Sequence, residues 1–333
     1  MADKCSKPAY RRLIVSALLA VAAFLGGCDE KNDVVVLKLA HSVDVSHPVH
    51  KAMVFMGQRL EEISDGKITL EIFPNEQLGS ERETIEQVQL GIIDITKTST
   101  APLESFIPKM GVFSIPYVFR GYDHFWNVLE GPIGDEVKQG GTAVKLYGLC
   151  FYDSGSRSFY TTSNPINSPA DLKGLKVRVQ QSNTAIEMVK ALGGSPTPIS
   201  YGELYTSLQQ GVVDGAENNP PSFETSRHYE VCKYYSLDEH TMVPDIIIIN
   251  SDFWDGLTDK QRQIIQEAAD ESSIYQRKLW KEKTQESLRI VKAAGVEIIH
   301  PDKTPFIKAV KDMHESYKGT EVGELLARIK EAK

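Results

Sequence analysis

The clearest chemical signal in the sequence is an arginine inside an apolar strand. Arg178 lies between Val177 and Val179, so in a strand its side chain faces away from both valines. A cation at such a position needs an anion or water. Its planar guanidinium holds N–H donors in a fixed fork, which suits a carboxylate bound through two parallel hydrogen bonds. The position therefore predicts a carboxylate-binding site.

Other polar residues lie near the ends of predicted strands. Asn218 follows a predicted strand over 212–214, where ligands bind in α/β folds, and its amide offers both donors and an acceptor. Lys97 and Ser99 are two residues apart at the end of the predicted strand 92–98. The period of two in a strand places both on one face.

No motif for catalysis or phosphate binding is present: the sequence has no GxSxG, P-loop, GxGxxG or HExxH. His47 and His50 are three residues apart and could in principle share a metal ion, but Pro48 between them favours a turn that leads into a helix. Carboxylates are plentiful, yet no pattern pairs two of them as acid and base. We therefore expect a binding protein rather than an enzyme, with no metal ion or cofactor.

The elements that must position these residues alternate between strands and helices, which predicts an α/β fold with mainly parallel sheets. The apolar patterns predict strands at 34–39, 68–72, 92–98, 144–152, 175–179, 212–214 and 246–249, and helices at 49–64, 81–90, 182–191 and 201–210. One further pattern, 259–293, contains no Pro or Gly. It predicts a helix of roughly 50 Å, long enough to run across two domains.

Length and charge narrow the class of protein further. A chain of 333 residues, 41% hydrophobic and 25% charged, has an ordinary globular composition, and its length favours two domains. The formal net charge is −8 and no basic block occurs, so nucleic acid is not an expected partner.

The first 27 residues predict a signal peptide rather than part of the fold. Four cations precede an apolar run over 13–25, which is too short to span a bilayer. The sequence Leu-Gly-Gly before Cys28 resembles a bacterial lipobox, in which the cysteine is lipidated and becomes the N-terminus. An ordinary signal peptide cut near Gly27, or an uncleaved anchor, is the alternative. Asp29 resembles an inner-membrane retention signal. We expect a periplasmic protein whose one attachment to the membrane is lipid on Cys28.

Two cysteines remain in the folded part, Cys150 and Cys232, both in apolar surroundings. An oxidising compartment permits a disulfide between them. Buried free thiols are common in such surroundings, and we favour two free thiols.

Several segments together closely resemble the DctP family of solute-binding proteins of TRAP transporters, over roughly residues 34–320. The segments are Gln77-Leu78-Gly79 with Glu81-Arg82, Ser114-Ile115-Pro116-Tyr117, Gly155-Ser156-Arg157-Ser158-Phe159, Asp171-Leu172-Lys173-Gly174-Leu175-Lys176-Val177-Arg178-Val179, Gly193-Gly194-Ser195-Pro196-Thr197-Pro198 and Val213-Asp214-Gly215-Ala216-Glu217-Asn218-Asn219-Pro220. The resemblance implies a periplasmic-binding-protein fold: two α/β domains, joined by a hinge of crossing strands and a long domain-spanning helix, that close on a ligand. It also implies delivery to a sodium-coupled membrane permease rather than catalysis.

On this basis we expect a tether over 28–33, a first domain over 34–155 plus 244–283, and a second over 156–243 plus 284–333. The resemblance also implies roles for single residues. Arg178 is the main carboxylate clamp, Arg157 is a second arginine, and Asn218 contacts the acidic end of the ligand. The expected ligand-binding set is Arg178, Arg157, Asn218, Glu81, Lys97, Ser99, His240, Tyr201 and His47.

The same set predicts the ligand class. Sialic-acid-binding relatives carry an acid at the position of Ser99 and an aromatic residue at that of Lys97, so sialic acid is not expected. The cations suit anionic oxygen, and the remaining polar groups suit hydroxyls, which an aliphatic acid would leave unpaired at a cost of about 1–3 kcal/mol each. We expect a sugar monocarboxylate such as glucuronate or galacturonate, with a C4-dicarboxylate as the alternative. An enzyme on a binding-protein fold and a sensor lipoprotein are alternatives of a different class. We expect a monomer.

Overall fold

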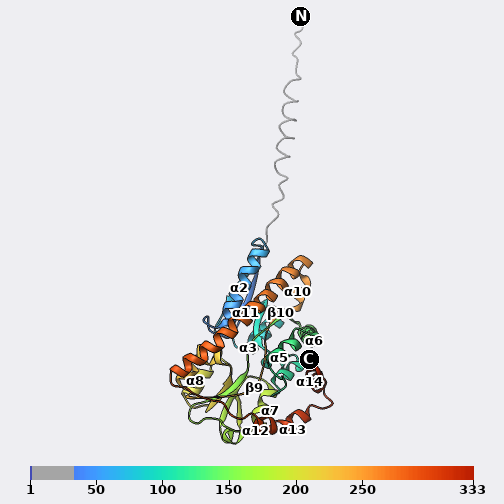
Figure 1. Cartoon of the computed structure of the whole chain (residues 1–333). Helices are drawn as coiled ribbons and strands as arrows, with labels where there is room; N and C mark the ends of the chain where they lie inside the picture. Colours follow the sequence, from blue (N-terminus) through green and yellow to red (C-terminus); the bar gives the residue numbers. More distant parts are fainter. Residues whose placement is uncertain (2–33) are drawn as a thin grey trace. The chain divides into compact units, whose positions relative to one another are not determined.

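The computed structural model describes residue 1 and residues 34–333. The expected signal peptide, with Cys28 and Asp29, lies outside the described residues. From Val36 to Lys333 the chain forms one compact unit, built from two β-sheets and the helices around them (Figure 1). Within the described part, no helix combines the length and the apolar character needed to cross a bilayer.

The first sheet has the strand order β2-β1-β3-β10-β4. Its strands are β1 (Val35–Ala40), β2 (Ile68–Phe73), β3 (Ile95–Ser99), β4 (Leu146–Tyr152) and β10 (Asp245–Asn250). β1 and β3 are parallel, whereas β10 runs antiparallel to both of its neighbours, β3 and β4. All six residues of β10 are buried, as expected for a central strand with an unbroken apolar run. We call this sheet and the elements packed on it the first lobe.

The second sheet has the order β11-β9-β5-β8-β6-β7. Its strands are β5 (Arg157–Thr161), β6 (Lys176–Val179), β7 (Ser195–Pro198), β8 (Gly215–Asn218), β9 (Tyr234–Thr241) and β11 (Glu297–Ile299). β6 is parallel to β7 and β8, while β5 is antiparallel to β8 and β9. We call this sheet and its helices the second lobe.

Both sheets are therefore mixed, whereas the order of the elements predicted mainly parallel ones. The chain passes from β4 in the first sheet to β5 in the second, and returns from β9 to β10. Each of these crossing segments adds a strand that runs against its neighbours. The expected class, an α/β fold of the periplasmic-binding-protein type with crossing strands and a long helix, is confirmed.

The helices follow the sequence pattern closely. They are α2 (Pro48–Ile63), α3 (Glu81–Gln89), α4 (Thr100–Leu103), α5 (Tyr122–Leu129), α6 (Pro132–Gln139), α7 (Asn183–Ala191), α8 (Leu204–Gln209), α9 (Pro220–Thr225), α10 (Ser251–Gly256), α11 (Asp259–Ala293), α12 (Thr304–Ala309), α13 (Lys311–Ser316) and α14 (Glu321–Glu331), with 3₁₀ helices η1 (Pro108–Ser114), η2 (Thr142–Val144), η3 (Pro169–Leu172) and η4 (His228–Glu230). A capping box of Ser80 with Glu83 fixes the start of α3, which places Glu81 in its first turn. One prediction was displaced: residues 212–214 lie before β8, so Asn218 ends that strand instead of following it.

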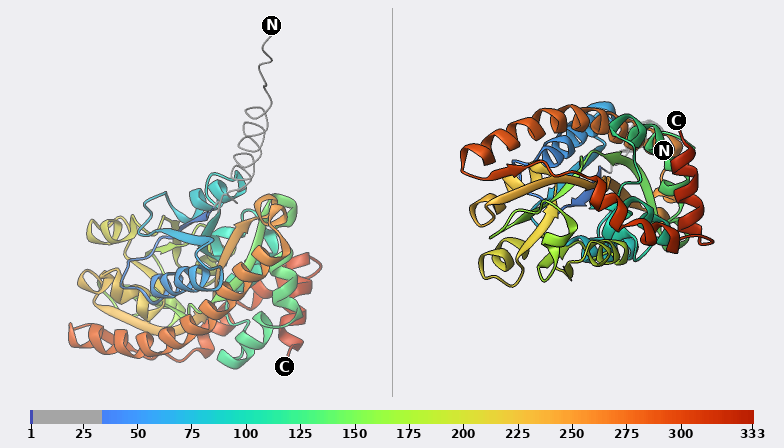
Figure 2. Two further views of the ribbon diagram at one scale, coloured as in Figure 1. Left: turned by 90° about the horizontal axis from the view of Figure 1, so that it is seen from above. Right: turned by 60° about the horizontal axis from the view of Figure 1, so that its bottom comes forward.

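The long helix α11 contacts both lobes. Its 35 residues match the predicted range, and a capping box of Thr258 with Gln261 fixes its start. The helix packs on α2 and β4 of the first lobe and on α9 of the second, and runs alongside both (Figure 2). At the β4–β5 crossing, the Gln276 amide exchanges two hydrogen bonds of 2.8 Å with the backbone of Asp153. α11 is thus tied to the segment that joins the lobes.

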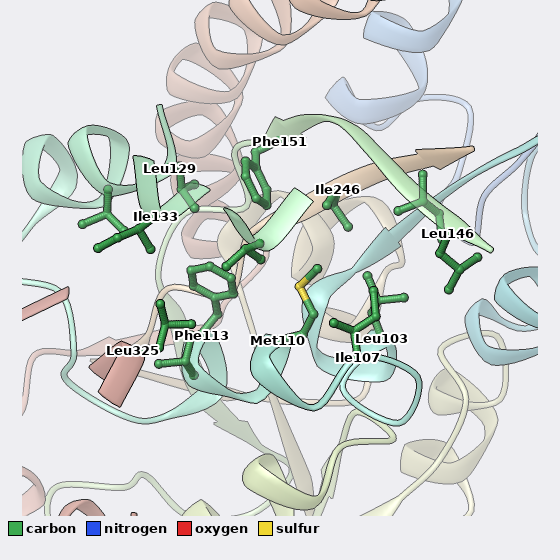
Figure 3. Close-up of a cluster of buried hydrophobic side chains, with 14 of the residues drawn as sticks. Leu103, Ile107, Met110, Phe113, Leu129, Ile133, Leu146, Phe151, Ile246 and Leu325 are labelled. Carbon is green, nitrogen blue, oxygen red and sulfur yellow. The ribbon is translucent and has the colours of Figure 1, made fainter. Parts of the chain in front are cut away.

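Each lobe has its own hydrophobic core. The core of the first lobe gathers residues such as Met110, Phe113, Phe151 and Ile246 (Figure 3). The C-terminal helix α14 adds its buried apolar face of Leu325, Leu326 and Ile329 to this core, although the predicted division placed residues 284–333 in the second domain. Two clusters fill the second lobe around Phe159 and Tyr160. Cys150 and Cys232 are buried and free, as predicted.

Candidate functional site

A small cavity lies where the two sheets face each other. Its lining consists of Ser42, Val43, His47, Glu81, Lys97, Ser99, Ser154, Arg157, Gln180, Tyr201, Asn218, Asn219, Ser222, Asp245 and Trp280. Several of these residues follow or end a strand: Ser42 follows β1, Ser99 ends β3, Gln180 follows β6 and Asn218 ends β8. Ligands bind at this end of the strands in α/β folds, so the cavity is the candidate binding site.

The structure brings most of the predicted residues together. Seven line this cavity: His47, Glu81, Lys97, Ser99, Arg157, Tyr201 and Asn218. Arg178 lines a neighbouring hollow, which also has Glu81, Gln180 and Tyr201 in its wall. His240 lines neither; it is buried, with its Nε2 3.5 Å from Glu217.

Arg178 is a buried cation with spare donors. Its Nε donates to the carbonyl of Ile199 at 2.9 Å, and its guanidinium lies 5.8 Å from the centre of the Tyr201 ring. Its Nη1 is buried without a hydrogen-bond partner among the described residues, and no described carboxylate forms a salt bridge with it. Burial lowers the pKa of Arg178. Since a buried charge needs a partner, this guanidinium is well placed to receive a ligand carboxylate.

Arg157, in contrast, is already paired inside the protein. Its Nη2 donates to a carboxylate oxygen of Glu217 at 2.8 Å, its Nε donates to the other oxygen, and its Nη1 donates to the Asn218 side chain at 2.9 Å. Burial would raise the pKa of Glu217, but Arg157 and His240 outweigh it and lower that pKa to about 2. Arg157 therefore holds Asn218 at the cavity, and Glu217 balances the positive charge of Arg157.

His240 completes this buried network. Its Nδ1 lies 2.8 Å from Asp238, and its Nε2 lies 3.5 Å from Glu217. Burial alone would lower the pKa of His240, but the two carboxylates raise it to about 9. His240 is therefore linked to the cavity only through Glu217, which pairs with Arg157, and does not line it.

Lys97 is also neutralised, although the sequence suggested it as a partner for anionic oxygen. Its Nζ lies 3.0 Å from Asp245 and 3.7 Å from Glu81. Burial would lower the pKa of Lys97, but the two carboxylates raise it. Glu81 in addition accepts a hydrogen bond of 3.1 Å from the Ser99 backbone. The Ser99 hydroxyl is buried without a partner among the described residues.

The aromatic side of the cavity joins the two lobes. His47 caps α2, where its Nδ1 accepts from the Val49 N–H at 3.3 Å. Its Nε2 lies 3.2 Å from the hydroxyl of Ser222 in the other lobe, and its ring meets Trp280 of α11 edge-on. Burial lowers the pKa of His47 well below its usual range, so the ring is neutral. Among the described residues, no three His, Cys, Asp or Glu side chains gather in a way that could hold a metal ion.

Sequence reasoning missed several members of the site. Glu217 lies in one of the family-like segments but carried no separate signal, because its pairing with Arg157 spans 60 residues. Asp245 directly precedes the apolar run 246–249, and its place opposite Ser99 depends on the antiparallel register of β10 with β3. Ser222 and Trp280 reach the site from α9 and α11. Both residues reach the site only through the packing of the folded chain.

The comparison with known proteins decides the family. Residues 39–320 match the model of the bacterial extracellular solute-binding proteins, family 7, named DctP. The chain belongs to this family. It is a TRAP solute-binding protein of the periplasm, and the family consists of binding proteins rather than enzymes.

Three solved structures illustrate the similarity. A TRAP periplasmic solute-binding protein from Xanthobacter autotrophicus Py2, with bound β-D-galacturonate, is 41% identical with a TM-score of 0.86, over 89% of this chain and 100% of the other. One from Roseobacter denitrificans, with bound β-D-glucuronate, is 36% identical with a TM-score of 0.87, over 90% and 100%. One from Polaromonas sp. JS666, bound to D-erythronate, is 32% identical with a TM-score of 0.87, over 90% and 99%. The fold is therefore shared throughout the folded part of the chain.

Proposed function

We propose that this TRAP receptor binds a hexuronate, glucuronate or galacturonate, in the cavity between its lobes and delivers it to a TRAP permease. The single observation that carries the proposal is the buried Arg178, whose Nη1 has no partner among the described residues. A ligand carboxylate supplies the missing acceptor and the opposite charge, and the planar guanidinium fits it through two parallel bonds. Because Arg178 carries a single positive charge, a ligand with one carboxylate matches it.

The remaining lining supports a polyhydroxylated ligand. The buried hydroxyl of Ser99 lacks a partner among residues 34–333, and Asn218, Gln180 and Glu81 add donors and acceptors to the walls. An aliphatic acid would leave such groups without hydrogen bonds, at a cost of about 1–3 kcal/mol each. The uronates bound to the Xanthobacter and Roseobacter relatives match this combination of one carboxylate and several hydroxyls.

A smaller sugar acid is a second candidate, because the Polaromonas relative is bound to D-erythronate, which also combines one carboxylate with hydroxyls. A thermal-shift screen separates these candidates. Glucuronate, galacturonate, erythronate, succinate and N-acetylneuraminate would be added singly to the purified protein. A ligand at 100 times its dissociation constant raises the free energy of unfolding by about 2.7 kcal/mol. We expect that stabilisation from a uronate; stabilisation by succinate alone would contradict the proposal.

We also propose that binding closes the two lobes about the segments that connect them. The proposed hinge comprises the β4–β5 and β9–β10 crossings and helix α11, which contacts both lobes. We propose that the lobes divide at residues 155–156, 243–244 and 283–284, with α14 (Glu321–Glu331) added to the first lobe because it packs on that core. Small-angle scattering should give a smaller radius of gyration with the uronate than without it. An unchanged radius at saturating ligand would contradict closure.

Finally, we propose that lipid on Cys28 anchors the receptor, with Asp29 favouring the inner membrane, and that the receptor works as a monomer. Support for the anchor is the lipobox-like sequence before Cys28. Import rather than sensing is tested in cells, where loss of this receptor should abolish uptake of the uronate. Normal uptake without the receptor would favour a sensor.

A further inference from the structure

We propose that Glu81 and Asp245 make the site selective for monocarboxylates by opposing a second carboxylate on the ligand. The excluded class includes the aldarates, sugar acids in which both ends of the carbon chain are carboxylates. The inference rests on the proposed function, since it assumes that a sugar acid is the ligand. These two residues would explain why a dicarboxylate binds weakly.

The first lobe contributes a wall with more negative than positive groups. Lys97 on β3 is the cation of this wall, and the carboxylates of Asp245 on β10 and Glu81 on α3 lie 3.0 and 3.7 Å from its Nζ. All three side chains line the cavity, and each is at most 12% exposed. Burial raises the pKa of Asp245, while the neighbouring Lys97 opposes that rise; with both carboxylates ionised, two on one ammonium leave this wall with an excess of one negative charge.

The second lobe contributes an excess of positive charge. Arg157 on β5 is matched by Glu217, while Arg178 on β6 has no carboxylate partner among the described residues. The net positive charge of the second lobe at the site therefore comes from Arg178, which lines the hollow beside the cavity. A ligand with one carboxylate can place it against the second lobe and its hydroxyls against the first.

A second carboxylate would meet the first wall. The Lys97 ammonium cannot serve it as a free cation, because Asp245 already lies within hydrogen-bond distance and Glu81 is close. The charged side chains of this wall are at most 12% exposed, so the repulsion is weakly screened. Unmatched like charges in such a site cost several kcal/mol, which corresponds to roughly 100-fold or more in affinity.

Hydroxyl groups fit the same wall. A hydroxyl donates to a carboxylate, and charge-assisted bonds of this kind are the stronger ones. The Ser99 hydroxyl, without a partner among residues 34–333, lies on the same strand as Lys97 and can pair with a neighbouring ligand hydroxyl. The wall thus favours an alcohol over a carboxylate at the same position of a ligand.

Matched pairs of sugar acids test the inference by calorimetry. Gluconate and glucarate differ only in whether the far end is an alcohol or a carboxylate, and so do galactonate and galactarate. Glucuronate and galacturonate are measured beside them. The readout is the dissociation constant of each aldarate divided by that of the tightest monocarboxylate of the same sugar. For the wild-type protein we expect a ratio of roughly 100 or more.

Two variants assign the effect to its residues. Glu81→Gln and Asp245→Asn each remove one carboxylate and leave Lys97 with the other, so each should lower the ratio at least about tenfold. Glu86→Gln is the matched control, because Glu86 lies on the same helix α3, is 46% exposed and lines neither the cavity nor the hollow beside it; it should leave the ratio unchanged. Circular dichroism checks folding, and Glu81→Gln decides the question if Asp245→Asn does not fold.

The outcomes separate the two proposals. If uronates bind but the aldarates bind within tenfold of them, the selectivity is refuted while the proposed function stands. The same holds if both folded variants keep the wild-type ratio, since the acids would then only hold Lys97 in place. If no sugar monocarboxylate binds, the proposed function fails, and the inference fails with it.

Discussion

Removing the guanidinium of Arg178 should nearly abolish ligand binding without unfolding the protein. Within the described residues this side chain makes one hydrogen bond, to the Ile199 carbonyl, and its Nη1 is buried without a partner. A buried cation without an anion contributes little to stability, and burial lowers its pKa. Arg178→Met fills similar space without the charge, so we expect the free protein to unfold at a similar or higher temperature.

The loss of affinity can be estimated from the proposed contact. Truncating one partner of a buried, hydrogen-bonded charge pair costs about 2–5 kcal/mol, which is roughly 30-fold to several thousand-fold in affinity. Arg178→Lys keeps the charge but not the planar fork, so it should recover only part of this loss.

Calorimetry with the uronate measures both variants, and circular dichroism confirms their folding. Lys176→Met is the matched control, because Lys176 lies on the same strand but is exposed; its affinity should equal that of the wild type. Near-wild-type affinity in a folded Arg178→Met protein would refute the assignment. The carboxylate would then bind at a different position in the site.

Three further predictions concern closure, pH and anchoring. The Glu104 carboxylate of the first lobe accepts hydrogen bonds from the hydroxyls of Ser182 and Thr184 at the start of α7 in the second lobe. Glu104→Gln should therefore weaken uronate binding, measured by calorimetry, about tenfold. An unchanged affinity would contradict a role of Glu104 in closure. The pKa of His240 in the folded protein is about 9, above the ordinary value of 6.5. The protonated ring therefore adds up to about 3 kcal/mol to the free energy of unfolding below pH 6.5, and this contribution is lost as the pH rises to 9. Urea unfolding at several pH values should show this loss in the wild-type protein but not in His240→Gln. Cys28→Ser should release the protein from the membrane fraction or block its processing; a wild-type protein that is soluble and lacks lipid would refute the anchor.

The elements with strong local patterns could be predicted from the sequence. The range of α11 follows from an unbroken helical pattern with a cap at Thr258, and the start of α3 follows from Ser80 and Glu83. The buried strand β10 follows from its apolar run. Its direction does not, because a fully apolar strand reads the same whether it pairs in parallel or antiparallel.

Prediction of the site depended on whether a residue acts alone or through a distant partner. Arg178 could be found because an arginine between two valines is anomalous within its own strand. The ion pairs of Lys97 could not be predicted, because its partners Glu81 and Asp245 are 16 and 148 positions away in the chain. Pairings over such distances are set by sheet order, which local sequence patterns do not contain.

Titration calorimetry of the purified receptor tests most simply whether one sugar monocarboxylate binds between the lobes. Glucuronate, galacturonate and succinate would each be titrated under the same conditions. We expect that one of the uronates binds in a one-to-one ratio and more tightly than succinate. Binding of succinate with no binding of either uronate would contradict it.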